Sequence, residues 1–154
     1  LAGLVWLFIY IRKKRKRGES IIPVTPPRPP HEVALEQLSA LEADHLWQRG
    51  KVKEFHSRVT EIVRQYIEQR FRVMALEQTS EEVLSSPTIG ELPTETTSHL
   101  RSMLVRADLV KFAKFEPPKE EHDASIASAK VFVESTIERE ETKAPVPQTA
   151  EAKA

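Results

Sequence analysis

Residues 52–71, VKEFHSRVTEIVRQYIEQRF, constrain the fold of this chain more than any other stretch. Large apolar side chains recur in it at positions 52, 55, 59, 62 and 66, in alternating steps of three and four residues. This spacing places one apolar stripe along an α-helix. Because an amphipathic helix has to bury its stripe against another element, Tyr66 and Phe71 are predicted to be core residues.

The segments on either side of this helix are also predicted to be helical. Before it, apolar residues at positions 33, 35, 38, 41, 46 and 47 have roughly helical spacing, and Gly50 favours a stop or a tight turn. After it, Thr79 and Glu82 have the spacing of a capping box, which satisfies unpaired amides at a helix start. A short helix is therefore expected here, with Val83 and Leu84 buried, before SSPTIGELP breaks the chain.

Two longer helices are predicted in the second half of the chain. One begins near Thr94, has its stripe at positions 100, 103, 104, 107 and 110, and is stopped by Pro117 and Pro118. The last one begins at Pro118, since proline is tolerated in a first turn, and ends near Glu140. No stretch competes as a strand, so the chain is expected to be all-α, with a bundle of about five helices over residues 31–140. The tail, residues 141–154, is expected to be disordered.

The N-terminal residues have the pattern of a membrane segment. Residues 1–11, LAGLVWLFIYI, are uncharged, and at about 1.5 Å per residue they would cover about half of a ~30 Å hydrocarbon layer. Six consecutive cations follow: Arg12, Lys13, Lys14, Arg15, Lys16 and Arg17. An apolar run before cations is typical of a stop-transfer segment, whereas a signal peptide has its cations first. We therefore expect the C-terminal part of a single transmembrane helix, with residues 12–154 in the cytoplasm.

The six cations are compatible with two kinds of partner. Next to an apolar run, they are expected to contact anionic lipid headgroups; the alternative is a nucleic-acid-binding arm. Without them, 17 basic residues remain against 23 acidic ones, which disfavours general affinity for nucleic acid. Residues 18–30 hold five of the eleven prolines and are predicted to be an extended linker between the membrane and the helices.

The sequence contains no catalytic or metal-binding motif that we recognise. The absence of cysteine excludes thiol catalysis and cysteine-ligated zinc. His31 and Glu32 begin the zinc-protease pattern, but position 35 is Leu where the pattern needs His. His45 and His56 could meet across a helical hairpin, although exposed histidines on charged helices are usually only solvated. We therefore predict a non-enzymatic protein without a metal or a cofactor.

Basic and aromatic residues alternate in residues 106–118, RADLVKFAKFEPP. Such a stretch either stacks nucleobases or forms the end of a buried helix, and the glutamates around it disfavour nucleic acid. We expect Phe112 and Phe115 to anchor the core and Lys111 and Lys114 to face water. Any aromatic side chain that stays exposed here would be a protein contact, so these four residues form the candidate partner surface.

Several stretches together resemble the cytoplasmic C-terminal region of BatD proteins, of the Bacteroides aerotolerance or oxygen-tolerance family. They are PPHEVALEQLSAL (29–41), LWQRGKVKEFHSRVTEIVRQYIEQRF (46–71), ALEQTSEEVL (75–84) and ADLVKFAKFEPPKEEHDASIASAKVFVE (107–134). The resemblance covers residues 1 to about 137. It implies a bacterial inner-membrane protein whose extracytoplasmic domains precede the span. It also implies two partners, a MoxR-type AAA+ ATPase and von Willebrand A-domain membrane proteins, and it carries no catalytic residues.

The leading hypothesis is a membrane-anchored protein-interaction module of the bacterial envelope. One alternative is a membrane protein that binds nucleic acid through the basic block and the stretch around Phe112. The other is a purely structural domain that oligomerises.

Overall fold

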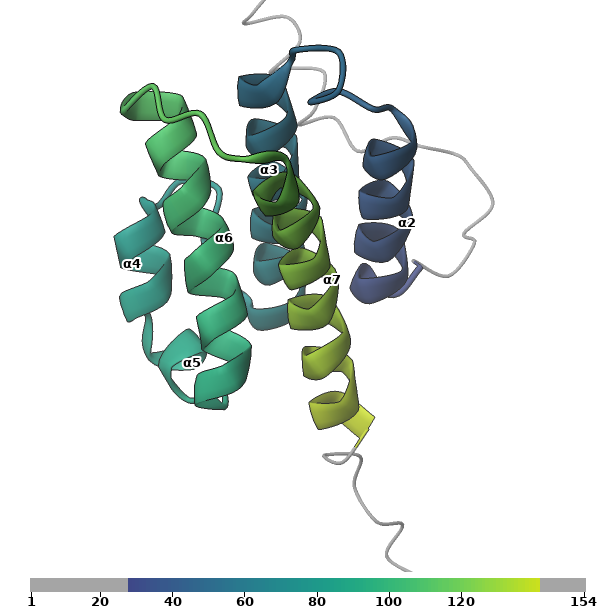
Figure 1. Cartoon of the computed structure of the whole chain (residues 1–154). Helices are drawn as coiled ribbons and strands as arrows, with labels where there is room; N and C mark the ends of the chain where they lie inside the picture. The colour runs from purple at the N-terminus through teal and green to yellow at the C-terminus, as the bar shows by residue number, and fades with distance from the viewer. Residues whose placement is uncertain (1–27, 142–154) are drawn as a thin grey trace, which may run out of the picture.

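The structure, a computed structural model, describes the backbone of residues 28–141 and the side chains of residues 28–137. In this part the chain forms helices and no strand, which confirms the all-α prediction (Figure 1). The helices are α2 (Pro30–Ala43), α3 (Val52–Phe71), α4 (Ser80–Ser85), α5 (Pro87–Gly90), α6 (Thr94–Phe112) and α7 (Lys119–Glu141). The one unexpected helix is α5, a single turn that begins at Pro87 within the stretch predicted to break the chain.

Several predicted segments lie outside the described residues. They are the membrane segment 1–11, the cations 12–17, nearly all of the linker 18–30 and nearly all of the tail 141–154. Within the described part, no helix is both long enough and apolar enough to cross a membrane.

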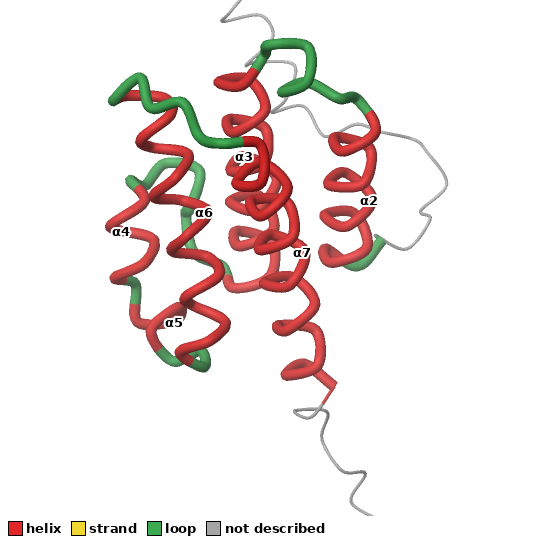
Figure 2. Tube along the Cα trace, viewed as in Figure 1, coloured by secondary structure: helices red, strands yellow, loops and turns green. Residues whose placement is uncertain are grey.

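Helices α3 and α7 each pack against the other three long helices, so α3 contacts α2, α6 and α7. Consecutive long helices run in opposite directions, so the turn 44–51 and the loop 113–118 lie at the same end, at the top of the view (Figure 1). We call these two segments the upper end of the bundle. In Figure 2 they are the loops that join α2 to α3 and α6 to α7.

The predicted stripe of α3 forms much of the core. Phe55, Val59, Val63, Tyr66 and Ile67 are buried, whereas Val52, Ile62 and Phe71 are half-buried. The prediction for Tyr66 is therefore confirmed, and the prediction that Phe71 is a core residue is only partly right. Phe71 is the last residue of the helix, and its ring meets the Tyr66 ring edge to face at 6.3 Å.

Tyr66 also joins α3 to α7. Its hydroxyl lies 2.5 Å from the Thr136 hydroxyl, and its ring meets the Phe132 ring edge to face at 6.2 Å. The predicted stripe of α6 is buried throughout and extends the core, with Leu100, Met103, Leu104, Ala107 and Val110. On α7, Ile126, Ala129 and Val133 are buried, and Ile137 is half-buried.

The first helix ends earlier than its apolar spacing predicted. It stops at Ala43, and His45 adopts a left-handed conformation (φ 51°) that turns the chain. Leu46 is nevertheless buried and Trp47 half-buried, because the turn folds back over the core. Gly50 then makes the predicted tight turn at φ 81°, a region that favours glycine.

Helix α6 likewise ends at Phe112, five residues before the proline that was expected to stop it. Lys114 is left-handed (φ 51°), and the Phe115 amide donates a hydrogen bond to the Leu109 carbonyl. This reversal, rather than Pro117, ends the helix, and it directs Pro117 into a buried position.

The capping box before α4 is confirmed. The Glu82 amide donates to the Thr79 hydroxyl, and the Glu82 carboxylate accepts from the Thr79 amide at 2.7 Å. The Glu82 carboxylate also accepts from the Thr79 hydroxyl, and the two hydrogen bonds that it accepts lower the pKa of Glu82. Val83 is buried as predicted, whereas Leu84 is only half-buried.

Candidate functional site

The structure places the two phenylalanines of the candidate partner surface in solvent. Phe112 is 80% exposed and Phe115 is 40% exposed, so the prediction that they anchor the core is wrong. Phe112 comes two residues after Val110, the last residue of the core stripe, so it lies on the opposite side of the helix, and Phe115 follows the end of α6 at Phe112. The second prediction for this stretch, that an aromatic residue left exposed here contacts a protein, therefore applies to both residues.

The two lysines of that surface are in different environments. Lys114 is exposed, as predicted. Lys111 is half-buried and its ammonium donates a hydrogen bond of 3.0 Å to the Thr60 hydroxyl on α3, so the prediction that it faces water is wrong. Burial lowers the pKa of Lys111, and the negative charge of Asp108 partly opposes this effect.

Phe112 belongs to an exposed apolar stripe on α6. Val105 (45% exposed) and Leu109 (43% exposed) precede it in steps of four and three, so the three side chains lie on one face of the helix. Phe115 continues this face beyond the helix end. We call Val105, Leu109, Phe112 and Phe115 the α6 stripe. Helix α6 thus has a second apolar face besides its core face, and that second face was missed in the sequence because it shares the helical period of the first.

Shallow grooves flank the α6 stripe on both sides. On the side of α7, Val105, Leu109 and Phe115 line a groove together with Arg106 and Glu121, whose side chains form an ion pair of 2.9 Å. Arg106 also donates to the Ser125 hydroxyl at 3.1 Å, and this contact fixes the start of α7 against α6.

On the other side, Phe112 and Leu76 line a groove together with Thr60, Arg64 and Lys111. Arg64 donates hydrogen bonds to the carbonyls of Ala75 and Gln78 and to the Ser80 hydroxyl. Arg64 thereby fastens segment 72–80 to α3, and this segment forms the wall of the groove that faces Phe112.

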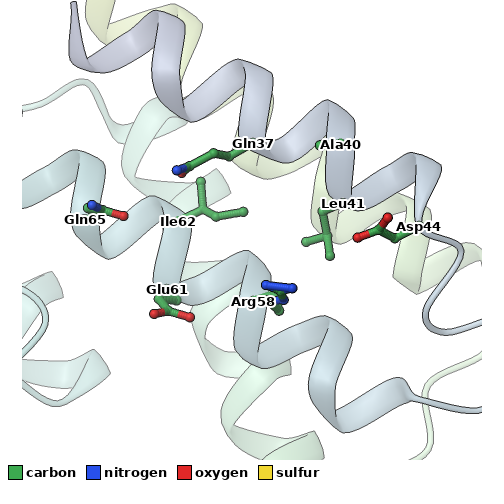
Figure 3. Close-up of a pocket in the computed structure, with 8 residues that line it drawn as sticks. All are labelled: Gln37, Ala40, Leu41, Asp44, Arg58, Glu61, Ile62 and Gln65. Atoms are coloured by element: carbon green, nitrogen blue, oxygen red, sulfur yellow. The ribbon is translucent and has the colours of Figure 1, made fainter. Parts of the chain in front are cut away.

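A third groove runs between α2 and α3 (Figure 3). Leu41 and Ile62 extend into the space between the helices, and Asp44, Arg58 and Glu61 lie around them. These polar groups do not converge on one point as the groups of a reaction centre would. In the described part of the chain, no group of three or more His, Asp or Glu side chains could hold a metal ion.

His45 and His56, which could have met across a helical hairpin and were expected to be solvated, are in different environments. His45 is exposed in the turn after α2, whereas His56 is buried (1% exposed) and faces α7. There the His56 Nε2 atom lies 3.0 Å from the Nδ1 atom of the buried His122. His122 was not among the residues singled out from the sequence, although His122, Ser125, Ile126 and Ala129 have helical spacing.

The histidine pair lies among aromatic rings at the upper end of the bundle. The half-buried Trp47 ring stacks on His122 with centroids 4.8 Å apart, and Phe55 meets both imidazoles edge to face. Burial, followed by the charges of His122, Arg106 and Lys111, lowers the pKa of His56 to about 4. Burial also lowers the pKa of His122, although Asp123 and Glu121 act in the opposite direction.

The predicted lipid-contacting cations, Arg12 to Arg17, lie outside the described residues. Comparisons of the chain with protein-family models, with curated proteins and with solved structures found no match.

Proposed function

We propose that the chain is a membrane-anchored protein-interaction module that docks a protein through the α6 stripe. The observation that carries this proposal is the exposed row of Val105, Leu109, Phe112 and Phe115. Single exposed apolar residues are common on protein surfaces, whereas a continuous row on one helix face is typical of a site that another protein covers. Aromatic residues are also enriched among the residues that contribute most to protein binding.

The surroundings of the stripe indicate what kind of surface would fit it. The flanking grooves supply shallow space on both sides of a raised helix. Arg101 and Lys114 are exposed beside the stripe, whereas Glu121 is already paired with Arg106. A partner with a shallow apolar surface and carboxylates at its rim would complement this arrangement.

The resemblance to BatD proteins supplies the class of partner. A MoxR-type AAA+ ATPase is the first candidate, and a von Willebrand A-domain membrane protein is the second. The apolar run 1–11 and the cations 12–17 support an anchor in the bacterial inner membrane, in contact with anionic lipids. The role of the chain would then be to hold its partner at the membrane, without catalysis of its own.

The test is recovery of the partner from native membranes with the full chain tagged at Ala154. Leu109→Glu and Phe112→Glu are compared with Val131→Glu, because Val131 is an exposed apolar residue (37%) on α7 rather than on the stripe. The expected result is loss of a MoxR-type ATPase or a von Willebrand A-domain protein in the two stripe variants only. A chain that lacks residues 31–140 should lose the partner as well.

Two outcomes contradict the proposal. Equal recovery from all variants would place the interaction outside the α6 stripe. Self-association of the chain that the stripe variants abolish, without any other protein recovered, would favour the oligomerisation alternative. Binding of nucleic acid is tested separately with residues 18–154, which lack the basic block; salt-sensitive binding there would favour the nucleic-acid alternative.

A further inference from the structure

The buried histidine pair joins two helices by one hydrogen bond that depends on protonation. His56 lies in the second turn of α3 and His122 in the first turn of α7, with 3.0 Å between Nε2 and Nδ1. A hydrogen bond between two imidazoles needs one N–H donor and one unprotonated nitrogen as acceptor. If both imidazoles become cationic, each carries a proton on its facing nitrogen, so two N–H groups face each other and repulsion between two cations replaces the bond.

We propose that the His56–His122 pair is a protonation-sensitive latch, which holds the first turn of α7 against α3 at neutral pH and releases it in acid.

The groups around the pair favour the neutral, closed state. From α6, the cations Arg106 and Lys111 face His56 and lower its pKa. From α7 itself, Glu121 and Asp123 raise the pKa of His122, but burial is the larger effect and the net shift is downward. From the turn 44–51, the uncharged Trp47 ring stacks on His122. The closed pair therefore binds a proton more weakly than a solvated imidazole does. Once the two side chains have separated, they bind a proton more tightly than the closed pair does, so acid favours the separated state.

The start of α7 is the element that should move when the pair separates. His56 follows the buried Phe55 and precedes the buried Val59 and Thr60, so α3 is fixed on both sides of it. In contrast, His122 is the first buried residue of α7, and the three residues before it are exposed or half-buried. Once His122 is released, the first turn of α7 and the loop 113–118, which includes the buried Pro117, can therefore leave together without requiring the rest of the bundle to open.

This opening would change the α6 stripe. Phe115 lies in the loop 113–118, and Glu121 in the first turn of α7 forms part of the groove beside Leu109. When these residues leave, the groove loses one wall and the Arg106–Glu121 ion pair is broken. The consequence for docking rests on the proposed function, whereas the opening itself does not.

The direct test is hydrogen exchange of the full chain, followed at the amides of residues 113–126 between about pH 7 and about pH 4.5. Protection is corrected for the pH dependence of chemical exchange. Because one pKa unit corresponds to a factor of ten, the lowered pKa of His56 predicts that protection falls by roughly 60-fold over this range. Amides in the middle of α3, around Val63, should lose less protection than residues 113–126, since they exchange only through larger openings.

A double variant isolates the latch. In His56→Gln with His122→Asn, the side-chain amides replace Nε2 and Nδ1 and can form a hydrogen bond that does not titrate. Its protection at residues 113–126 should vary by less than about twofold after the same correction, because no titrating group remains in the pair. The control His99→Gln, which removes a histidine away from the pair, should behave like the wild-type chain. Glu121→Gln removes the carboxylate that pairs with Arg106, so any remaining pH dependence cannot come from protonation of that ion pair. This variant should retain most of the pH dependence of the wild-type chain.

The proposal is overturned if protection of residues 113–126 in the wild-type chain stays constant down to about pH 4.5, a result that requires no variant. It is also overturned if the double variant folds and loses protection as steeply as the wild type, or if Glu121→Gln alone abolishes the effect. Neither measurement uses a partner protein, so the latch and the docking function can fail independently.

Discussion

The imidazole of His56 meets that of His122 in the core, although 66 residues separate them in sequence. One ring donates to the other across 3.0 Å, and Trp47 and Phe55 lie against the pair. Helix α3, helix α7 and the turn 44–51 are therefore joined at one point. Because the two imidazoles at this point can bind protons, the stability of the bundle should depend on pH.

We predict that the free energy of unfolding decreases as the pH falls from about 6.5 to about 4. The unfolded chain binds a proton on His56 near its ordinary pKa of about 6.5, whereas the folded chain does so only at about 4. Between these values the unfolded state holds more protons, so stability rises with pH. The contribution of His56 is fully present above about pH 6.5, and about 3 kcal/mol is lost on acidification to about pH 4.

Urea unfolding of the full chain at a series of pH values checks this prediction. The carboxylates also titrate toward the acidic end of the range, so the informative quantity is the difference between the wild-type chain and His56→Gln with His122→Asn. The double variant should have the shallower dependence. If the two slopes are the same, the pair does not couple folding to pH.

Replacement of Tyr66 and Phe71 by Ala should distinguish a core residue from a residue at a helix end. Tyr66→Ala removes a fully buried ring and should cost about 3–5 kcal/mol, whereas Phe71→Ala should cost clearly less because Phe71 is half-buried. Tyr66→Phe keeps the ring but leaves the Thr136 hydroxyl without this partner, at a cost of about 1 kcal/mol. Chemical unfolding measures all three. Equal costs for the two Ala variants would contradict the burial described here.

Arg64 should be needed to hold segment 72–80. Its guanidinium donates to two carbonyls and one hydroxyl of that segment, an arrangement that a lysine ammonium does not reproduce. Arg64→Lys and Arg64→Ala should both speed limited proteolysis within residues 72–79, and Arg64→Ala should cost about 1–3 kcal/mol of stability. Arg58→Ala, which replaces an exposed arginine on the same helix, is the matched control. A cleavage rate that matches this control would show that the segment is held by other contacts.

Phe112 and Phe132 should differ sharply in their effect on stability. Phe112→Ser replaces a side chain that is 80% exposed and should change the free energy of unfolding by no more than about 0.5 kcal/mol. Phe132→Ala removes a fully buried ring and should cost about 3–5 kcal/mol. A large cost for Phe112→Ser, measured in the absence of any partner, would mean that Phe112 anchors the core after all.

The local rules of helix formation predicted much of the fold. The stripe at positions 52–66 formed α3, the stripe at positions 100–110 formed the buried face of α6, and the capping box at Thr79 and Glu82 started α4. Each of these signals lies within a few turns of one helix, so no other part of the chain is needed to interpret it.

The positions of helix ends were predicted less accurately. Helices α2 and α6 both end earlier than predicted. Just beyond each end, a non-glycine residue, His45 or Lys114, adopts a left-handed conformation that sequence spacing does not reveal.

The candidate site was located by its composition but not by its geometry. Alternating lysines and phenylalanines identified Phe112 and Phe115, but the exposure of Phe112 depended on which face of α6 it shares, and that of Phe115 on where α6 ended. Similarly, His56 was considered only beside His45, because the two could meet across a predicted hairpin, and it was expected to be solvated. The true partner, His122, comes from a helix that packs against α3 only in the assembled bundle.

The sequence by itself determined that the chain is helical and which face of α3 is buried, because periodicity is a property of each segment alone. It also determined the charge pattern of residues 1–17. Only the tertiary structure decided that Lys111 bonds Thr60, that His56 meets His122 and that the α6 stripe stays uncovered. The physical reason is that a hydrophobic stripe requires burial without specifying its neighbour. Pairings between segments follow from helix directions and loop conformations, which no single stretch encodes.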